Sequence, residues 1–205
     1  MNEPNVQSPI VEKLSDSIAV VRFNRPAERN ALSTPTLDKL DIMLSNLISD
    51  HKLNSIIFTG TGNVFSSGAD IRELATLDVN RARDFSSKGQ RLFQRIAEAP
   101  QLTIAAINGY CMGGGLDLAL ACDIRVAASS AVFAHPGARL GIITGWGGTL
   151  RLPRVIGKAR ALEFFITAQR MTSKEAKEIG LISRIGDPVI DCALEFSHKK
   201  TRMAD

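Results

Sequence analysis

The segment LTIAAINGYCMGGGLDLALACD, residues 102–123, decides the fold that we predict for this chain. Its first part, from Leu102 to Ile107, is apolar apart from Thr103, which indicates a short buried strand. A glycine-rich turn follows, and we interpret the apolar stretch from Leu116 to Cys122 as a short helix. A strand, a glycine turn and a helix in this order are typical of the βα unit in a layered α/β protein.

Further strand and helix signals of the same kind occupy the remaining sequence. Short apolar runs predict strands at residues 18–23, 55–59, 124–127 and 131–133, and apolar stripes predict helices from Thr34, from about Asp78, over 158–168 and over 173–179. No repeat, low-complexity tract or linker interrupts this series. We therefore predict a single domain over residues 1–205, with a core from about 10 to 185 and a short polar tail over 186–205.

The composition narrows the class of protein. The 205 residues include 25 Lys and Arg against 21 Asp and Glu, a net charge of +4, and 44% are hydrophobic, as in ordinary globular domains. Basic and acidic residues are interleaved, and the chain has one Trp and one Tyr, which disfavours a nucleic acid partner. The three cysteines lack CxxC spacing, which argues against a disulfide framework or a zinc site. No window reaches the ~18 apolar residues of a membrane span, so we expect a cytoplasmic protein with no membrane partner.

Two glycine-containing loops are the first candidates for chemistry. They are FSSGADI, residues 65–71, and GGGLD, residues 113–117. Glycines at a helix start leave backbone N–H groups uncovered where the partial positive charge favours an anion. One amide from each loop could hold a single oxygen as an oxyanion hole, or the glycines could serve only tight turns and close packing. Phosphate-loop, dinucleotide and nucleophile-elbow motifs are absent from the sequence.

Two titratable residues lie close to these loops in the sequence. Asp117 stands in the first turn of an otherwise apolar helix, where it is either a partner of the helix dipole or a catalytic acid/base whose pKa is raised by burial. His135 is the histidine nearest a glycine-rich segment, and it is either a possible auxiliary acid/base or a hydrogen-bonded structural residue. His51 and His198 lie in polar contexts, and we expect both to be solvated.

Several motifs, taken together and in order, resemble the enoyl-CoA hydratase/isomerase (crotonase) superfamily. They run from about residue 10 to residue 185 and are NRP (24–26), NAL (30–32), FSSGADI (65–71), NGYCMGGG (108–115), CD (122–123), GGT (147–149), LPR (152–154), Ala176 and GL (180–181). Each motif alone is weak, but their joint order and spacing are specific.

The resemblance implies a crotonase-like α/β fold, a spiral of ββα turns with two roughly perpendicular sheets surrounded by helices. It also implies an acyl-CoA thioester as ligand, with no cofactor apart from the CoA of the substrate and no metal. By position, the amides of Ala69 and Gly114 correspond to the oxyanion hole. The residues implied in substrate binding are Arg29, Ala69, Asp70, Ile71, Arg72, Gly113 and Gly137.

The sequence departs from the family pattern at two places. Hydratases of this family use two glutamates, and the corresponding positions here are Asp117 and Gly137. We therefore expect Asp117 to act as the acid/base of a hydratase/isomerase-type enzyme, with His135 as the nearest candidate for a second group. The alternatives are isomerisation, decarboxylation or thioester hydrolysis with one carboxylate, or a catalytically impaired acyl-CoA-binding relative. Family members usually form trimers or hexamers, and we expect the truncated C-terminal helical part to weaken that homo-oligomer.

Overall fold

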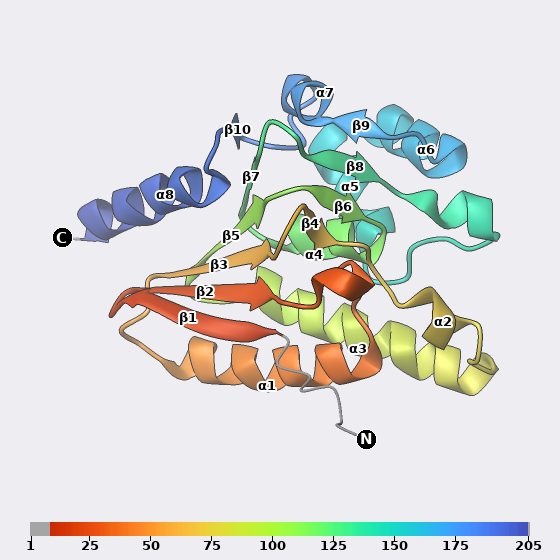
Figure 1. Cartoon of the computed structure of the whole chain (residues 1–205), viewed down its shortest axis with the longest axis horizontal. Coiled ribbons are helices and arrows are strands. Elements are labelled where there is room, and N and C mark those ends of the chain that lie inside the picture. Colours follow the sequence, from red (N-terminus) through yellow and green to blue (C-terminus); the bar gives the residue numbers. More distant parts are fainter. Residues whose placement is uncertain (1–8, 205) are drawn as a thin grey trace.

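Two β-sheets and the helices around them make up the structure, a computed structural model that describes residues 9–204 (Figure 1). The larger sheet has the strand order β1 (Ile10–Ser15), β2 (Ile18–Phe23), β3 (Ser55–Gly60), β5 (Leu102–Ile107), β7 (Ile124–Ala127), β10 (Arg184–Ile185). The smaller sheet has the order β4 (Val64–Ser66), β6 (Tyr110–Met112), β8 (Val132–Ala134), β9 (Met171–Thr172). Strand pairing is parallel except for β1 with β2 and β8 with β9.

The chain passes from the larger sheet to the smaller one three times, at β3–β4, β5–β6 and β7–β8, and each pass is followed by helices. This arrangement confirms the predicted ββα spiral. The helices are η1 (Pro26–Glu28), α1 (Thr34–Ser49), α2 (Ile71–Leu74), α3 (Val79–Ala97), α4 (Gly114–Ala121), η2 (Pro136–Leu140), α5 (Gly148–Ile156), α6 (Lys158–Thr167), α7 (Ser173–Glu178) and α8 (Val189–Ala204).

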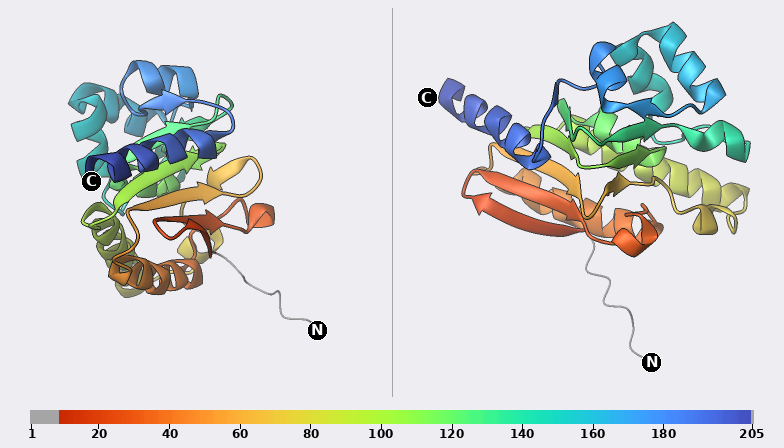
Figure 2. Two further views of the ribbon diagram at one scale, coloured as in Figure 1. Left: turned by 90° about the vertical axis from the view of Figure 1, so that its left-hand side faces the viewer. Right: turned by 45° about the horizontal axis from the view of Figure 1, so that its top comes forward.

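The central strands β2, β3 and β5 of the larger sheet are buried on both faces, which explains their continuous apolar sequences. Successive side chains of a strand point to opposite faces. Val21 and Phe58 accordingly join the cluster that includes the buried stripe of α1, whereas Val20 and Ile57 join the cluster formed with α8. Figure 2 shows α8 on the side of the sheet opposite to α1.

The prediction of a polar tail over residues 186–205, beyond a core ending near residue 185, is wrong. Helix α8 occupies most of this segment, and Val189, Ala193 and Ser197 form a buried stripe at helical spacing. Val189 and Ala193 pack in one cluster with Ile104 of β5. Ile190, Leu194 and Phe196 stand between these positions and are partly buried against the same cluster, so the polar character of the segment comes from Asp191, Glu195 and the residues from His198 onward.

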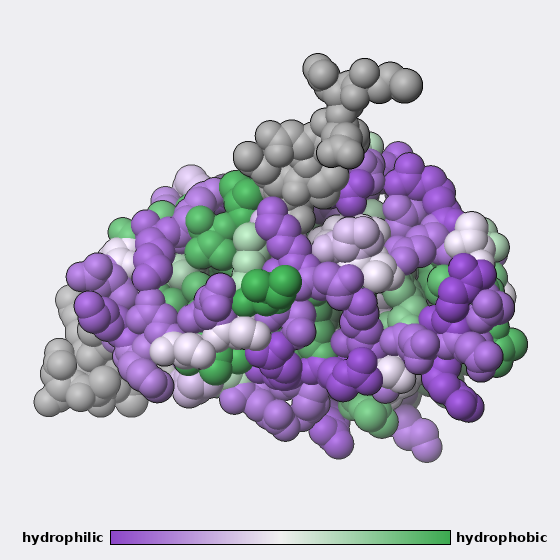
Figure 3. All heavy atoms as spheres, turned by 90° about the horizontal axis from the view of Figure 1, so that it is seen from below, coloured by the Kyte–Doolittle hydropathy of each residue, from purple (hydrophilic) through white to green (hydrophobic). Residues whose placement is uncertain are grey.

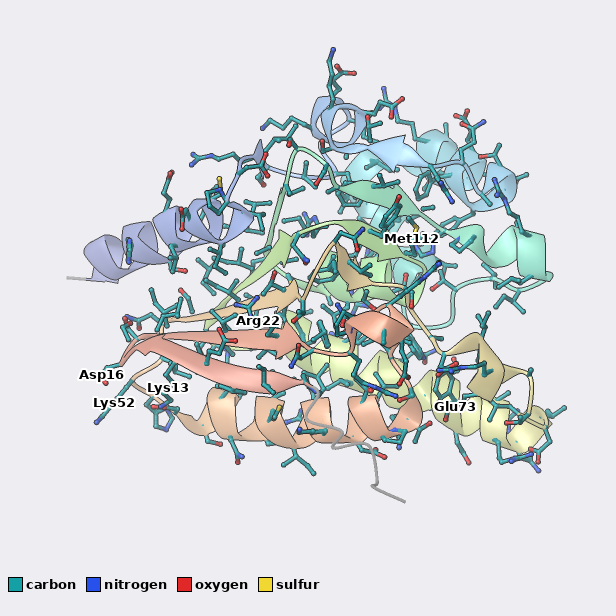
Figure 4. The ribbon with its side chains drawn as sticks, viewed as in Figure 1. Lys13, Asp16, Arg22, Lys52, Glu73 and Met112 are labelled. Carbon is teal, nitrogen blue, oxygen red and sulfur yellow. The ribbon has the colours of Figure 1, made fainter. Side chains whose placement is uncertain are left out.

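The hairpin edge of the larger sheet is charged. β1 is the outer strand, and Lys13 from it forms an ion pair with Asp50 at 2.7 Å. Figure 4 shows Lys13, Asp16 and Lys52 together at one end of this hairpin. Charged side chains on an outer strand oppose pairing with another chain.

Seen from the side of α1, the surface is mostly hydrophilic, with small separate hydrophobic patches (Figure 3).

Helix α1 is tied to α2 at its first residue. Thr34 N donates a 2.9 Å hydrogen bond to the carboxylate of Glu73, and the Thr34 hydroxyl bonds the same group. Glu73, labelled in Figure 4, thus caps α1 in place of Ser33, whose side chain makes no capping bond. This contact holds α2, which begins at the end of the loop of residues 65–71, against the start of α1.

Candidate active site

A cavity of about 280 Å³ lies where both glycine-containing loops meet α3 and the segment from His135 to Trp146. Most of its lining is apolar and includes Leu74 and Phe85. Among the described residues that line it, the polar side chains other than the indole of Trp146 belong to Ser67, Ser86, His135 and Thr144. An apolar cavity with few polar groups is typical of a small-molecule site.

The two predicted amides approach each other at the wall of this cavity. A Cβ atom on Gly114 would lie 3.4 Å from Ala69 N, and one on Gly68 would lie 2.7 Å from Gly114 N. Only glycine fits the second position, where φ is also +89°. Within residues 9–204, the hydrogen bonds found outside helices and strands include none donated by Ala69 N or Gly114 N. Both residues line the cavity, so two amides without a protein acceptor stand close together there.

The loop that holds Ala69 is fixed from the segment before α1. Leu32 N donates to Gly68 O at 2.8 Å, and Ser66 Oγ donates to Asn30 O at 2.9 Å. The buried Asn30 side chain donates to Val64 O at 2.7 Å. Asn30, the first residue of the NAL motif, therefore holds the loop in place through these bonds and does not line the cavity.

Asp117 lies in the first turn of α4, as predicted, but it does not line the cavity. Its side chain is fully buried. One carboxylate oxygen, Oδ2, accepts a hydrogen bond from the Thr144 hydroxyl. The other, Oδ1, faces His135 Nε2 at 3.4 Å, and neither of these two atoms has an aligned hydrogen-bond partner among the described residues. Asp117 therefore reaches the cavity only through its neighbours.

Burial raises the pKa of Asp117 from 3.8 to about 7. The Thr144 hydroxyl, the backbone amides of Trp146 and Gly148, and the charge of Arg151 all lower this pKa, so desolvation is the larger effect. Close to neutral pH the carboxyl group is thus present in both its protonated and its ionised form, as an acid/base requires.

His135 follows β8 directly and is nearly buried, with 3% of its surface exposed. Its ring packs against Phe164 and Phe165 of α6, with centroid distances of 6.1 and 5.0 Å. Burial lowers the pKa of His135 from 6.5 to about 4. The contact with Asp117 is therefore not an ion pair at neutral pH, because the imidazole is uncharged. The predicted solvated histidines, His51 and His198, are exposed.

Sequence reasoning missed Thr144 and Trp146, although both stand in a glycine-dense stretch. The indole of Trp146 packs between α3 and the start of α4: a Cβ on Gly89 would lie 2.3 Å from it, and one on Gly114 would lie 2.4 Å away. Trp146 Nε1 donates to Phe85 O at 3.3 Å. The glycines at 89 and 114 leave room for this ring, so Gly114 has a packing role besides its amide.

Gly137, which matches the second glutamate of the family pattern, lines the cavity but has no room for a side chain. A Cβ there would lie 2.6 Å from Ile142 O, and Ile142 N donates to Gly137 O at 3.0 Å. The chain doubles back closely at this point. A carboxylate at position 137 would require the segment up to Ile142 to move.

The other residues predicted to bind the substrate differ in their surroundings. Asp70 caps α2 and accepts bonds from Arg72 N and Nε at 3.0 Å and from Nη2 at 2.7 Å, which holds the pKa of Asp70 below its usual value. Arg72 also bonds Glu28 at 3.2 Å, so two carboxylates balance its charge. Arg29 is exposed and forms no ion pair within the described part of the chain. Ile71 is 61% exposed and lines the cavity, as Gly113 does.

A cluster of metal-ligating side chains and a membrane-spanning helix are both absent from residues 9–204. No group of three or more His, Cys, Asp or Glu side chains in this range is placed to hold a metal ion. No helix in this range combines the length and the apolar character that crossing a membrane requires.

The ββα spiral defines a protein of the crotonase fold class, and comparison with known proteins agrees. The model of the family "Enoyl-CoA hydratase/isomerase" matches residues 13–199. The chain therefore belongs to the enoyl-CoA hydratase/isomerase family.

Individual relatives support this assignment. A "Short-chain-enoyl-CoA hydratase" of Clostridium acetobutylicum is 38% identical over 193 residues, which cover 93% of this chain and 74% of the relative. A "Crotonyl-CoA hydratase" of Syntrophomonas wolfei is 39% identical over 180 residues, 87% of this chain and 69% of the relative. The crystal structure of an enoyl-CoA hydratase from Bacillus anthracis superposes with a TM-score of 0.91 at 35% identity, covering 95% of this chain and 77% of that one.

Proposed function

We propose that this chain acts on acyl-CoA thioesters by enolate chemistry, with the amides of Ala69 and Gly114 as the oxyanion hole. The observation that carries the proposal is the close approach of these two amides at the wall of an apolar cavity. Backbone N–H groups aimed at a thioester oxygen stabilise the negative charge that develops there in the transition state. No cofactor is required beyond the CoA that the substrate itself carries.

Asp117 is the acid/base in this proposal. Its pKa of about 7 supports the role, because general acid–base catalysis is most effective when the pKa lies near the working pH. Relatives named "Short-chain-enoyl-CoA hydratase" and "Crotonyl-CoA hydratase" make the addition of water to a short 2-enoyl-CoA the reaction to test first. Arg29, Ile71 and the Asp70–Arg72 pair are proposed to border the CoA part of the ligand.

The test begins with the wild-type protein. It is incubated with crotonyl-CoA, a 3-enoyl-CoA and a malonyl-type ester, and the products are identified by mass spectrometry. Addition of water, a shifted double bond or loss of CO2 would each support enolate chemistry and would name the reaction. Loss of the thioester alone would indicate a hydrolase.

Two variants at one position then test the oxyanion hole. Gly114→Ala and Gly114→Pro both add atoms against Trp146, but only proline removes the N–H donor. We expect Gly114→Pro to be slower than Gly114→Ala by about 100-fold or more, as for loss of one oxyanion donor. Equal rates in two folded variants would reject Gly114 as a donor.

A second candidate function is acyl-CoA binding without turnover. It is favoured by Gly137, which supplies no second carboxylate, and by the burial of Asp117 away from the cavity. Calorimetry with crotonyl-CoA separates the two candidates, because this function predicts tight binding of the ester with no product from any of the three substrates.

A further inference from the structure

The acid/base of the proposed function is sealed from the cavity in which the thioester would lie. Asp117 is fully buried and does not line the cavity. Two cavity-lining side chains contact its carboxyl group, Thr144 at Oδ2 and His135 near Oδ1. A proton that moves between Asp117 and the cavity must therefore pass through one of these two groups.

Thr144 has the geometry of a relay. Its hydroxyl donates its one hydrogen to Asp117 Oδ2, so the oxygen still has lone pairs with which to accept a hydrogen bond. When Asp117 is protonated, the carboxyl group can donate to Thr144 instead, and the hydroxyl hydrogen is then free to turn toward the cavity. A single hydroxyl thus serves both directions of proton transfer.

The loop around Thr144 is fixed from several sides. Gly145 O accepts bonds from Ser86 Oγ at 3.1 Å and from Gln90 Nε2 at 2.7 Å, both from α3. The next residue, Trp146, is held by its bond to Phe85 O at 3.3 Å. This anchoring keeps the Thr144 hydroxyl between the carboxyl group and the cavity, which reduces the reorganisation that a proton transfer requires.

We propose that the Thr144 hydroxyl is a catalytic proton relay that links the buried Asp117 to water or substrate in the cavity. This inference rests on the proposed function, and it deepens it by allowing one carboxyl group to perform both the base step and the acid step.

The step balances for addition of water to a 2-enoyl thioester. As the water oxygen bonds to C3, one water O–H bond breaks and its proton passes to Thr144 Oγ1, while the Thr144 proton passes to Asp117 Oδ2. The electron pair of the C2–C3 double bond moves into the thioester, where its oxygen becomes the enolate anion. The proton of Asp117 then returns through Thr144 to C2, which regenerates the carboxylate and completes the addition of one water molecule.

His135 is the weaker route. Its Nε2 lies 3.4 Å from Asp117 Oδ1 without an aligned hydrogen bond, and its ring packs against Phe164 and Phe165. Because burial keeps its pKa at about 4, it carries no extra proton to donate at neutral pH. The charge of Arg151 in α5 lowers the pKa of Asp117, and the charge of Asp117 in turn raises the pKa of the Cys111 thiol in β6.

The test compares variants in a single-turnover assay of water addition to crotonyl-CoA. Thr144→Val removes the hydroxyl and keeps the branched shape, whereas Thr144→Ser keeps the hydroxyl. Thr149→Val is the matched control, because Thr149 is exposed on α5 and, within residues 9–204, the hydroxyl found bonded to Asp117 is that of Thr144. His135→Gln tests the other route. Folding and ester binding are checked by circular dichroism and by calorimetry with crotonyl-CoA.

We expect Thr144→Val to slow water addition by about 100-fold or more, the usual contribution of acid–base catalysis. Thr144→Ser should stay within about tenfold of the wild type, His135→Gln should remain faster than Thr144→Val, and Thr149→Val should be unchanged. We expect the wild-type rate to depend on a group of pKa about 7, and the residual rate of Thr144→Val should lose this dependence.

Two results would overturn the relay alone. They are a Thr144→Val protein with the wild-type rate and pH profile, and a Thr144→Ser protein as slow as Thr144→Val. In either case an active wild type would leave the proposed function standing. A folded wild type that binds crotonyl-CoA and adds no water to it would overturn the relay as written, and failure with all three thioesters would overturn the proposed function as well.

Discussion

The buried carboxyl group of Asp117 should make the stability of the protein depend on pH in a direction opposite to that of most acidic residues. Its pKa is about 7 in the folded state and 3.8 without burial, so the folded protein holds this proton more tightly than the unfolded chain. The stabilisation from Asp117 is therefore complete below pH 3.8 and is lost as the pH rises through about 7. With ~1.4 kcal/mol for each pKa unit, the loss amounts to about 4 kcal/mol.

Asp117→Asn removes this titration. The assay is urea unfolding of both proteins from pH 4 to pH 8, with the free energy of unfolding of the variant subtracted from that of the wild type at each pH. As the pH rises over this range, this difference should fall by about 4 kcal/mol. The lowered pKa of His135 acts in both proteins and cancels to first order. Asp70→Asn is the control, because Arg72 lowers the pKa of Asp70, so this carboxyl group titrates below the range and its difference should stay nearly constant from pH 4 to pH 8. A difference constant within about 1 kcal/mol would refute the assigned pKa.

Two further predictions concern glycines that stand against other groups. Gly137→Glu should lower the melting temperature by about 2–10 °C, because its Cβ would lie 2.6 Å from Ile142 O. The variant should also catalyse the proposed reaction no faster than the wild type. A stable variant with increased activity would contradict this expectation. Gly89→Ala should destabilise the wild type by about 1–3 kcal/mol but cost much less in a Trp146→Ala background, because the added methyl group meets the indole. Urea unfolding of the wild type, the two single variants and the double variant gives the coupling free energy between Gly89→Ala and Trp146→Ala. Additive effects on the free energy of unfolding would show that the two residues do not compete for space.

The central part of the fold follows directly from the sequence. Residues 102–123 form β5 and α4 in the predicted order, because an apolar strand, a glycine turn and an apolar helix are local signals, whereas β6 lies within the stretch predicted as a turn. Helix α8 was not predicted, because Asp191, Glu195 and the polar run from His198 onward give its sequence the character of a solvated tail. Helix α5 was also missed, because Gly148 at its start and Pro153 within it are signals against a helix.

The candidate site was predictable only in part. The sequence placed Ala69, Gly114 and Asp117 by local pattern and by family resemblance, and the structure brings the first two together at the cavity. The contact between Thr144 and Asp117 joins residues 27 positions apart, so no local pattern could indicate it. The closure of the chain at Gly137 likewise depends on where Ile142 lies.

Trp146 is the single tryptophan of the chain, and it lines the cavity beside Gly114. The tryptophan fluorescence of the protein therefore originates at one ring, next to the position where a thioester carbonyl would be held. A change in emission on adding a ligand therefore reports the surroundings of this one ring, without a dye and without a second tryptophan to subtract.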